Sequence, residues 1–212
     1  MMLVDPDPRI FVVDDDRALL TAIERVLSSS GYQVQTFASP AFFIEQLPYD
    51  GPACLVLDLR MPDLNGLDVQ DWLLFKGIAM PTVFLSGASD VPTTARAMRK
   101  GAVDFLVKPV DEGELLAAVS RALAAAVESR RRDREAAQSN ERLARLTRRE
   151  REVCELVARG LLNKQIASEL GASEKTIKVH RGRVMRKLEV ESVAELVWLL
   201  SRLPPAASPR SR

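Results

Sequence analysis

Five short apolar runs alternate with helical segments along the first half of the chain, and this alternation constrains the fold most. The runs occupy residues 10–13, 34–37, 54–57, 82–85 and 105–107. Their residues are almost all apolar, which is typical of strands whose two faces are both covered. Strands that alternate with helices in this way predict a doubly wound α/β fold with a five-stranded parallel sheet.

Local signals delimit the helices between these strands. Gly31 suits the left-handed position that follows a helix. Ser39 and Pro40 suit the N-cap and the first helical position. We expect a further helix to start at Asp90, and the last helix of this half to start near Asp111.

Polar side chains follow four of the five strands. They are Asp14, Asp15, Asp58, Ser86 and Lys108. In open α/β sheets, ligands bind beyond the carboxyl ends of the strands, so we expect these residues to form one site. Converging carboxylates repel one another unless a cation neutralises them, and Mg²⁺ suits a few hard oxygen ligands. A carboxylate beside Mg²⁺ can attack phosphorus, and an ammonium and a hydroxyl can neutralise the phosphoryl oxygens.

The net charge of +1 conceals two halves of opposite sign. Residues 1–125 hold 10 Lys/Arg and 17 Asp/Glu, whereas residues 126–212 hold 20 Lys/Arg and 12 Asp/Glu. An acidic half joined to a basic half suggests two functions, with the second near nucleic acid. On charge alone, two solvated surfaces of opposite sign remain the simpler alternative.

The remaining composition points to the cytoplasm. Cys54 and Cys154 lie far apart in apolar segments, as expected of buried thiols in a reducing compartment. No uncharged apolar run approaches the roughly 18 residues of a membrane helix, and the first residues contain no apolar signal core. One His and two Cys argue against a dedicated zinc site.

The second half has the pattern of a helix–turn–helix. Residues 121–142 contain neither Gly nor Pro, so we expect the preceding helix to continue as a linker. Thr147 and Glu150 form a capping box in the sequence, and Ser192 and Glu195 form a second one. Asn163 is expected to cap a short helix. Gly171 then ends that helix, Ser173 caps the next, and this arrangement is typical of a helix–turn–helix.

The helix from Ser173 to Leu188 has one apolar and one basic face when it is unrolled at about 100° per residue. The apolar face consists of Ile177, Val184 and Leu188. The opposite face and its flanks consist of Lys175, Lys178, Val179, Gly182, Arg183 and Arg186. A basic exposed face on the second helix of such a unit suits the DNA major groove.

The segments FVVDDD, LVLDLRMPDLNG, VFLSG and AVDFLVKP resemble the receiver domain of bacterial two-component response regulators, which has a flavodoxin-like fold. This resemblance implies that Asp58 is the phosphorylated aspartate and that Asp14 and Asp15 are the acidic Mg²⁺ pair. It also implies that the backbone carbonyl of Arg60 is a metal ligand. The implied switch and phosphate-binding residues are Ser86, Phe105 and Lys108. In this family the bond corresponding to Lys108–Pro109 is often cis.

The stretch from Leu146 to Leu188 resembles the LuxR-type DNA-binding domain, and with the receiver it indicates the NarL/FixJ family, in its FixJ-like branch. The resemblance implies that Lys178 and Val179 contact bases and that Lys164 contacts phosphate. The full set of expected DNA contacts is Lys164, Lys175, Thr176, Lys178, Val179, Gly182, Arg183 and Arg186. Gly182 departs from relatives that carry Lys there, so either DNA approaches the main chain closely or that contact is absent.

These observations predict a receiver domain at 1–125, a helical linker at 126–142, a DNA-binding domain at 143–204 and a disordered tail at 205–212. We expect a cytoplasmic transcription factor, not an enzyme, that Mg²⁺ and a histidine kinase control through Asp58. Phosphorylation would promote a homodimer that binds double-stranded promoter DNA. RNA polymerase is a further expected partner, and a membrane is not.

Two alternatives compete with this prediction. Asp14 and Asp16 fit the Asp-x-Asp nucleophile of haloacid-dehalogenase-like phosphatases, although Asp58 then has no role and Asp16 is also a good helix N-cap. A receiver-like DNA binder that works without phosphate is the other alternative. The intact set of site residues argues against it.

Overall fold

The computed structural model of the chain describes residues 6–62, 64–87 and 96–201. It divides into two compact units, Met1–Arg130 and Arg131–Arg212, which are described separately. Within the described ranges, every helix is too short or too polar to span a lipid bilayer.

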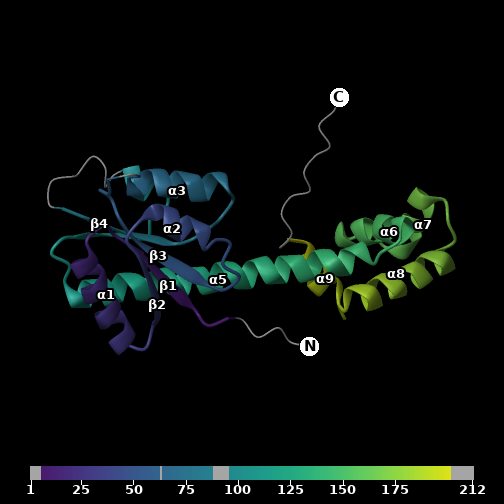
Figure 1. Cartoon of the computed structure of the whole chain (residues 1–212). Coiled ribbons are helices and arrows are strands. Elements are labelled where there is room, and N and C mark those ends of the chain that lie inside the picture. Colours follow the sequence, from purple (N-terminus) through teal and green to yellow (C-terminus); the bar gives the residue numbers. More distant parts are fainter. Residues whose placement is uncertain (1–5, 63, 88–95, 202–212) are drawn as a thin grey trace, which may run out of the picture. The chain divides into compact units, whose positions relative to one another are not determined.

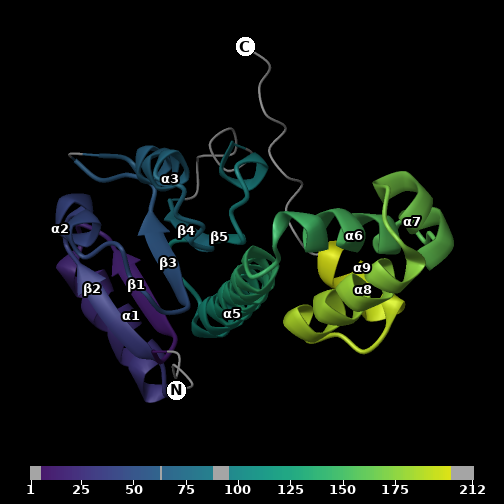
Figure 2. The ribbon, with the colours of Figure 1, turned by 90° about the vertical axis from the view of Figure 1, so that its right-hand side faces the viewer.

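The first unit contains a five-stranded parallel sheet (Figure 1), with the strand order β2-β1-β3-β4-β5 that Figure 2 shows from left to right. The strands are β1 Arg9–Val13, β2 Gln33–Phe37, β3 Ala53–Asp58, β4 Thr82–Ser86 and β5 Asp104–Val107. This sheet confirms the doubly wound α/β fold that the alternating pattern predicts. In the register, Asp58 lies beside Leu85 and Ser86 beside Val107, so the strands end at a common edge.

Helices cover both faces of this sheet (Figures 1 and 2). They are α1 Arg17–Ser29, α2 Pro40–Glu45, α3 Gly66–Phe75 and α5 Glu112–Ala144, and residues 96–99 are also helical. Helices α1 and α5 pack on one face, and α2 and α3 pack on the other. The expected helix start at Asp90 lies outside the described residues. Helix α5 continues without interruption from the first unit to Ala144.

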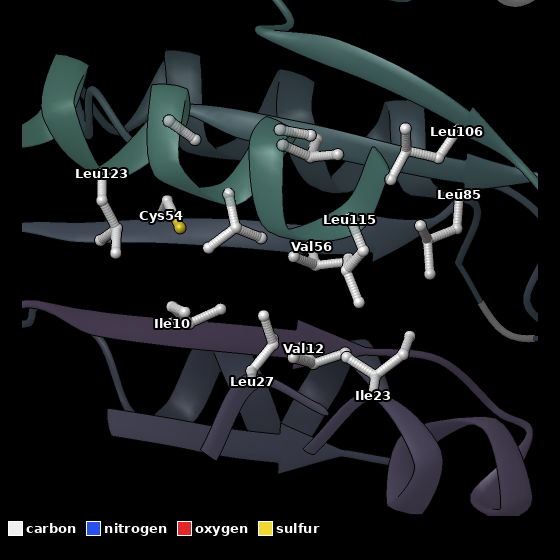
Figure 3. Close-up of a cluster of buried hydrophobic side chains, with 14 of the residues drawn as sticks. Ile10, Val12, Ile23, Leu27, Cys54, Val56, Leu85, Leu106, Leu115 and Leu123 are labelled. Carbon is white, nitrogen blue, oxygen red and sulfur yellow. The ribbon is translucent and has the colours of Figure 1, made fainter. Parts of the chain in front are cut away.

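The alternation of side chains along β1 builds both halves of the core. Ile10 and Val12 pack with Leu27 of α1 and Leu115 of α5, as Figure 3 shows. The intervening Phe11 and Val13 face the opposite layer, in which Phe43 of α2 and Leu73 of α3 are buried. Successive side chains of a strand point to opposite faces, so a continuous apolar run is required when both faces are covered.

Up to residue 201, where the described part of the second unit ends, this unit consists of the end of α5 and four shorter helices, α6 Arg148–Ala158, α7 Asn163–Leu170, α8 Glu174–Leu188 and α9 Val193–Ser201. Its core includes Val153, Ile166, Ile177 and Leu196. The expected capping box of Thr147 and Glu150 is present at the start of α6. Gly171 has the left-handed conformation (φ 61°) between α7 and α8, as the helix–turn–helix pattern requires.

Two of the expected caps differ in the structure. Asn163 is the first residue of α7 and not its N-cap, and its side chain accepts a hydrogen bond from Arg181 (3.1 Å). The N-cap is Leu162, whose amide donates to the side chain of Gln165.

The capping box predicted at the start of α9 is half present. The Ser192 hydroxyl accepts from the amide of Glu195 (3.1 Å), but the Glu195 carboxylate accepts from the amide of Glu191 instead of that of Ser192. The reach of a Glu side chain allows either amide, and local backbone geometry decides between them. The tail expected at 205–212 lies outside the described residues.

Candidate functional site

Three carboxylates converge at the carboxyl edge of the sheet. Asp14 follows β1 and is fully buried, Asp58 ends β3 and is 4% exposed, and Asp15 is exposed. One oxygen of each lies within 4.8 Å of the others. This spacing suits a single small cation with oxygen ligands.

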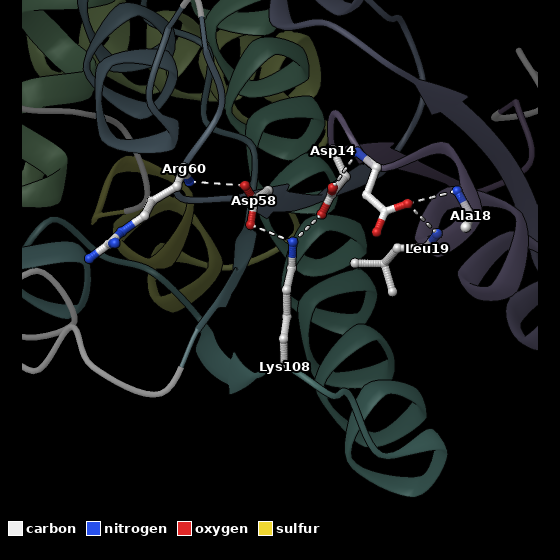
Figure 4. Close-up of polar contacts among 7 residues, drawn as sticks. Asp14, Ala18, Leu19, Asp58, Arg60 and Lys108 are labelled. Atoms are coloured by element: carbon white, nitrogen blue, oxygen red, sulfur yellow. Dashed lines mark hydrogen bonds and ion pairs between the residues drawn. The ribbon is translucent and has the colours of Figure 1, made fainter.

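Lys108 comes to the same place from the end of β5. Its ammonium nitrogen lies 2.7 Å from Asp14 Oδ2 and 2.7 Å from Asp58 Oδ1. Figure 4 shows its side chain reaching between the two carboxylates. The Lys108–Pro109 peptide bond is cis, as in the family that the motifs resemble. The site therefore combines three carboxyl groups with one ammonium group.

The main chain orients the two buried carboxylates. The amide of Arg60 donates to Asp58 Oδ2 (3.0 Å), and the amide of Asp16 donates to Asp14 Oδ1 (2.9 Å) (Figure 4). The remaining oxygens, Asp58 Oδ1 and Asp14 Oδ2, bind Lys108. Each buried carboxylate is thus held by one backbone donor and one ammonium.

Gly66 supports the site in a way that the sequence motifs alone do not reveal. A Cβ at Gly66 would lie 2.4 Å from the backbone oxygen of Asp58, so any larger residue would displace the end of β3. The Gly66 amide also donates to the backbone oxygen of Leu59 (3.0 Å). The Asn65-Gly66 pair, which is typical of a turn, is the sequence signal that could have indicated this position.

Burial and charge shift the ionisation of the site in opposite directions. Burial, the largest influence, raises the pKa of the Asp58 carboxyl, while the hydrogen bond from Lys108 acts to lower it. Burial by itself lowers the pKa of the Lys108 ammonium, but its bonds to Asp14 and Asp58 outweigh that effect and the pKa is raised. Lys108 consequently carries its charge at neutral pH.

Ser86 is the last residue of β4, and Phe105 is the second residue of the neighbouring strand β5, where it lies beside Phe84. The Ser86 side chain is buried, and its hydroxyl donates to the backbone oxygen of Gly87 (3.1 Å). The Lys108 amide donates to the Ser86 backbone oxygen (2.7 Å), which ties the two strand ends together. Phe105 is half-buried and packs against the core layer that contains Phe84.

Asp16 has a structural role that disfavours the phosphatase alternative. Its carboxylate accepts hydrogen bonds from the amides of Ala18 (2.8 Å) and Leu19 (3.2 Å) at the start of α1 (Figure 4). It is therefore the N-cap of this helix. Among the described residues, the carboxylates close enough to share a metal ion are Asp14, Asp15 and Asp58, and Asp16 is not one of them.

The exposed face of α8 is a second candidate site. Ile177, Val184 and Leu188 are buried as the helical pattern predicts. The expected DNA contacts on this helix are all exposed, namely Lys175, Thr176, Lys178, Val179, Gly182, Arg183 and Arg186. Lys164, the second residue of α7, is exposed as well. Thr176 also takes part in the cap, since its amide and hydroxyl both bond the Ser173 hydroxyl.

Polar contacts, some of them partly buried, hold α8 against its neighbours. Lys187 of α8 donates to Glu150 Oε2 of α6 (2.6 Å) and to the backbone oxygen of Arg145 (3.0 Å). The hydrogen bond from Lys187, together with that from the Thr147 amide, lowers the pKa of the Glu150 carboxyl to about 2. The Arg181–Asn163 bond links α8 to α7. These contacts fix the two helices of the helix–turn–helix.

A parallel α/β unit with an acidic edge site, followed by a helix–turn–helix with a basic exposed helix, defines a DNA-binding protein under phosphorylation control. Comparison with protein families supports this class. Residues 10–120 match the response regulator receiver domain, and residues 144–200 match the bacterial regulatory proteins of the luxR family. The chain belongs to the response regulators that join a receiver domain to a LuxR-type DNA-binding domain.

Individual relatives agree with this assignment. The response regulator protein TodT of Pseudomonas putida is 42% identical over 92% of this chain and 86% of its own length. The transcriptional regulatory protein FixJ of Bradyrhizobium diazoefficiens is 37% identical over 91% of this chain and 94% of its own. The solved structure of the response regulator StyR is 41% identical and matches with a TM-score of 0.85, covering 93% of this chain and 100% of that one.

Proposed function

We propose that Asp58 accepts a phosphoryl group from a histidine kinase. In this step an Asp58 carboxylate oxygen attacks phosphorus, the P–N bond to the kinase imidazole breaks, and the electron pair stays on the imidazole nitrogen. The observation that carries the proposal is the position of Lys108, 2.7 Å from Asp58 Oδ1. Its ammonium stands where negative charge accumulates during the transfer, which is the arrangement that stabilises a transition state.

The acidic cluster supports Mg²⁺ as the cofactor of this reaction. We assign the ligands to Asp14, Asp15, Asp58 and the backbone carbonyl of Arg60. The three carboxylate oxygens within 4.8 Å fit a hard cation that keeps several waters. When it is bound, Mg²⁺ supplies positive charge for the phosphoryl oxygens.

We assign the switch to Ser86 and Phe105. The Ser86 hydroxyl donates to a neutral backbone oxygen of its neighbour Gly87, and a phosphoryl oxygen on Asp58 would be a stronger acceptor. Rotation of this hydroxyl toward Asp58 would change the packing around the half-buried Phe105. The altered surface of the receiver then promotes a homodimer.

The output is binding of promoter DNA through α8. Lys178 and Val179 would contact bases in the major groove, while Lys164 would contact phosphate at the start of α7. The remaining exposed residues, Lys175, Thr176, Gly182, Arg183 and Arg186, complete the proposed interface. A dimer presents two such helices to two half-sites.

We place the domain limits at 1–125 for the receiver, 126–142 for the linker and 143–204 for the DNA-binding domain. The division of the structure between Arg130 and Arg131, within α5, lies inside the proposed linker. We infer that the protein acts in the cytoplasm, where its DNA partner is found. We also infer that RNA polymerase is a further partner. The function of the protein is then to bind DNA and not to catalyse the turnover of a substrate.

Incubation of the full chain with Mg²⁺ and acetyl phosphate, followed by mass measurement, tests the proposal. The wild-type chain should gain one phosphoryl group that is sensitive to hydroxylamine, as an acyl phosphate is. Asp58→Asn should gain none, because an amide cannot form the acyl phosphate. The matched control is Asp71→Asn, which removes a carboxylate that pairs with Lys100 outside the site and should label normally.

Each outcome separates the alternatives. Absence of labelling in the wild-type chain would support a receiver that works without phosphate. Continuous release of phosphate without accumulation of the adduct would support the phosphatase. Labelling that persists in Asp58→Asn would refute Asp58 as the acceptor.

A further inference from the structure

Gly182 lies in the middle of α8, on the exposed face that carries the proposed DNA contacts. Lys178 and Arg186 lie one turn before and one turn after it on the same face. Glycine is one of the least favourable residues in a helix interior. Its presence at this position therefore needs a physical reason.

The structure of the chain itself supplies no such reason. The glycines with positive φ are Gly31, Gly77, Gly101, Gly160 and Gly171. Gly182 is not among them, so its backbone is compatible with any residue. A Cβ placed at Gly182 would have no heavy atom of the described residues within 4 Å, so packing does not demand glycine either. The remaining reason is close approach by something outside the chain.

The exposed side chain of Val179 indicates that the group that approaches Gly182 is apolar. Val179 is 49% exposed, although lysine and arginine residues surround it on this face. Positions i and i+3 are neighbours on a helix surface, so the Val179 side chain stands beside the bare main chain at Gly182. A Cβ at Gly182 would meet no heavy atom of the described residues within 4 Å, so the space beside Val179 at this position is open, and we call this open space the recess. The exposed basic residues Lys175, Lys178, Arg183 and Arg186 lie on the same helix.

We propose that this recess receives the C5-methyl group of a thymine in each half-site. The methyl group of thymine is the apolar group that base pairs present in the major groove, and the other base-edge features there are hydrogen-bond donors and acceptors. The Val179 side chain would contact the thymine methyl group, and the absence of a side chain at Gly182 would leave space for it. The inference rests on the proposed role of α8 in the major groove, and it makes Gly182 a specificity-determining residue through the side chain that it lacks.

Replacement of thymine by deoxyuridine tests the inference, because it removes only the methyl group. The full wild-type chain, activated with acetyl phosphate and Mg²⁺, first selects its preferred site from random duplexes. Each thymine of that site is then replaced in turn, and affinities are measured at fixed salt. One position in each half-site should lose about fourfold in affinity, as expected for the burial of one methyl group.

Gly182→Ala fills the recess with a methyl group of its own. It should bind the thymine duplex less tightly than the wild-type chain does, and it should no longer prefer thymine over deoxyuridine. Val179→Ala shortens the side chain that would contact the thymine methyl group and should lose the same preference. Thermal unfolding of Gly182→Ala should occur at the same temperature as that of the wild-type chain or higher, since alanine favours helices. Gly113→Ala is the control from the other unit: Gly113 is exposed in the first turn of α5, its added methyl group would lie 3.2 Å from Asp111 Oδ1, and this variant should bind DNA as the wild-type chain does.

The outcomes distinguish this inference from the proposed function. Failure of the wild-type chain to select any sequence would overturn both. Selection of a site in which no thymine methyl matters, or equal affinity of Gly182→Ala and the wild-type chain for the thymine duplex, would overturn the inference alone. Loss of thymine preference in both α8 variants, with normal selection by the wild-type chain, would establish it.

Discussion

The ammonium group of Lys108 lies 2.7 Å from Asp58 Oδ1, although 50 residues separate the two along the chain. Asp58 ends β3, whereas Lys108 follows β5, and these two strands are not adjacent in the sheet. The same ammonium binds Asp14 Oδ2 at 2.7 Å. It therefore neutralises part of the negative charge that would otherwise draw a cation into the cluster. Lys108 both competes with Mg²⁺ for these oxygens and prepares the site for a phosphoryl group.

Lys108→Met should separate these two roles. Without the ammonium, Mg²⁺ should bind the three carboxylates about tenfold more tightly, equivalent to about 1.4 kcal/mol. Phosphoryl uptake from acetyl phosphate should nevertheless slow, because the phosphoryl oxygens lose a charge-assisted partner. Calorimetric titration with Mg²⁺ and the time course of labelling measure the two effects. Lys100→Met is the control, since Lys100 pairs with Asp71. Weaker Mg²⁺ binding by Lys108→Met would contradict the competition.

Asp15→Ala should affect the metal without affecting the fold. Asp15 is exposed, whereas Asp14 and Asp58 are buried, so its removal leaves the core packing intact. The cluster loses one of its three carboxylates, and Mg²⁺ affinity should fall by about tenfold, or about 1.4 kcal/mol. Calorimetric titration should show this loss while the unfolding temperature stays unchanged. Unaltered Mg²⁺ affinity would remove Asp15 from the proposed ligand set.

Glu150 should make the second unit sensitive to acid. Its folded-state pKa is lowered to about 2, from an ordinary value of 4.5, first by the hydrogen bond from Lys187. A lowered folded-state pKa means that the carboxylate stabilises the unit fully above about pH 4.5 and progressively less as the pH falls toward 2. Hydrogen exchange of the amides of α6 and α8, measured in the full chain between pH 5 and pH 3, should show this loss.

Glu150→Ala should remove the same contribution at neutral pH. The free energy of unfolding of the second unit should fall by roughly 1.5–3 kcal/mol, the range for hydrogen bonds to charged groups. Glu169→Ala is the control, because Glu169 is an exposed acid 3.9 Å from Arg159 and should change stability little. If both variants had the same stability and the same pH profile, the contact between Glu150 and Lys187 would not stabilise the unit.

Lys178 and Lys164 should contribute to DNA binding in different ways, Lys178 through a base and Lys164 through a phosphate group. Lys178→Ala should cost roughly 1–3 kcal/mol and relax specificity at one base position, as loss of a base contact does. Lys164→Ala should weaken all sequences about equally and lower the salt slope by about 1, as loss of a phosphate contact does. Titrations of specific and scrambled duplexes at several salt concentrations measure both effects. Equal weakening of both duplexes by Lys178→Ala would contradict its base-contact role.

Much of this protein follows from local sequence patterns. The apolar runs set the strands because only apolar side chains can be buried on both faces of a sheet. The carboxyl ends of parallel strands meet at one edge, so Asp14, Asp58 and Lys108 could be assigned to one site before any contact was known. The burial of Ile177, Val184 and Leu188 likewise follows from the helical repeat.

Only the tertiary structure decided which close contacts and hydrogen bonds individual residues make. The close approach of Gly66 to the backbone of Asp58 depends on the path of a loop, which the strand pattern does not specify. Asn163 could have capped α7 by sequence, but Arg181, 18 residues away, takes its side-chain oxygen. Local patterns determine which faces are buried because burial depends on periodicity. A polar side chain can accept a hydrogen bond from any of several donors. The donor that it uses depends on distances across the fold, and these distances are set only when the elements have packed.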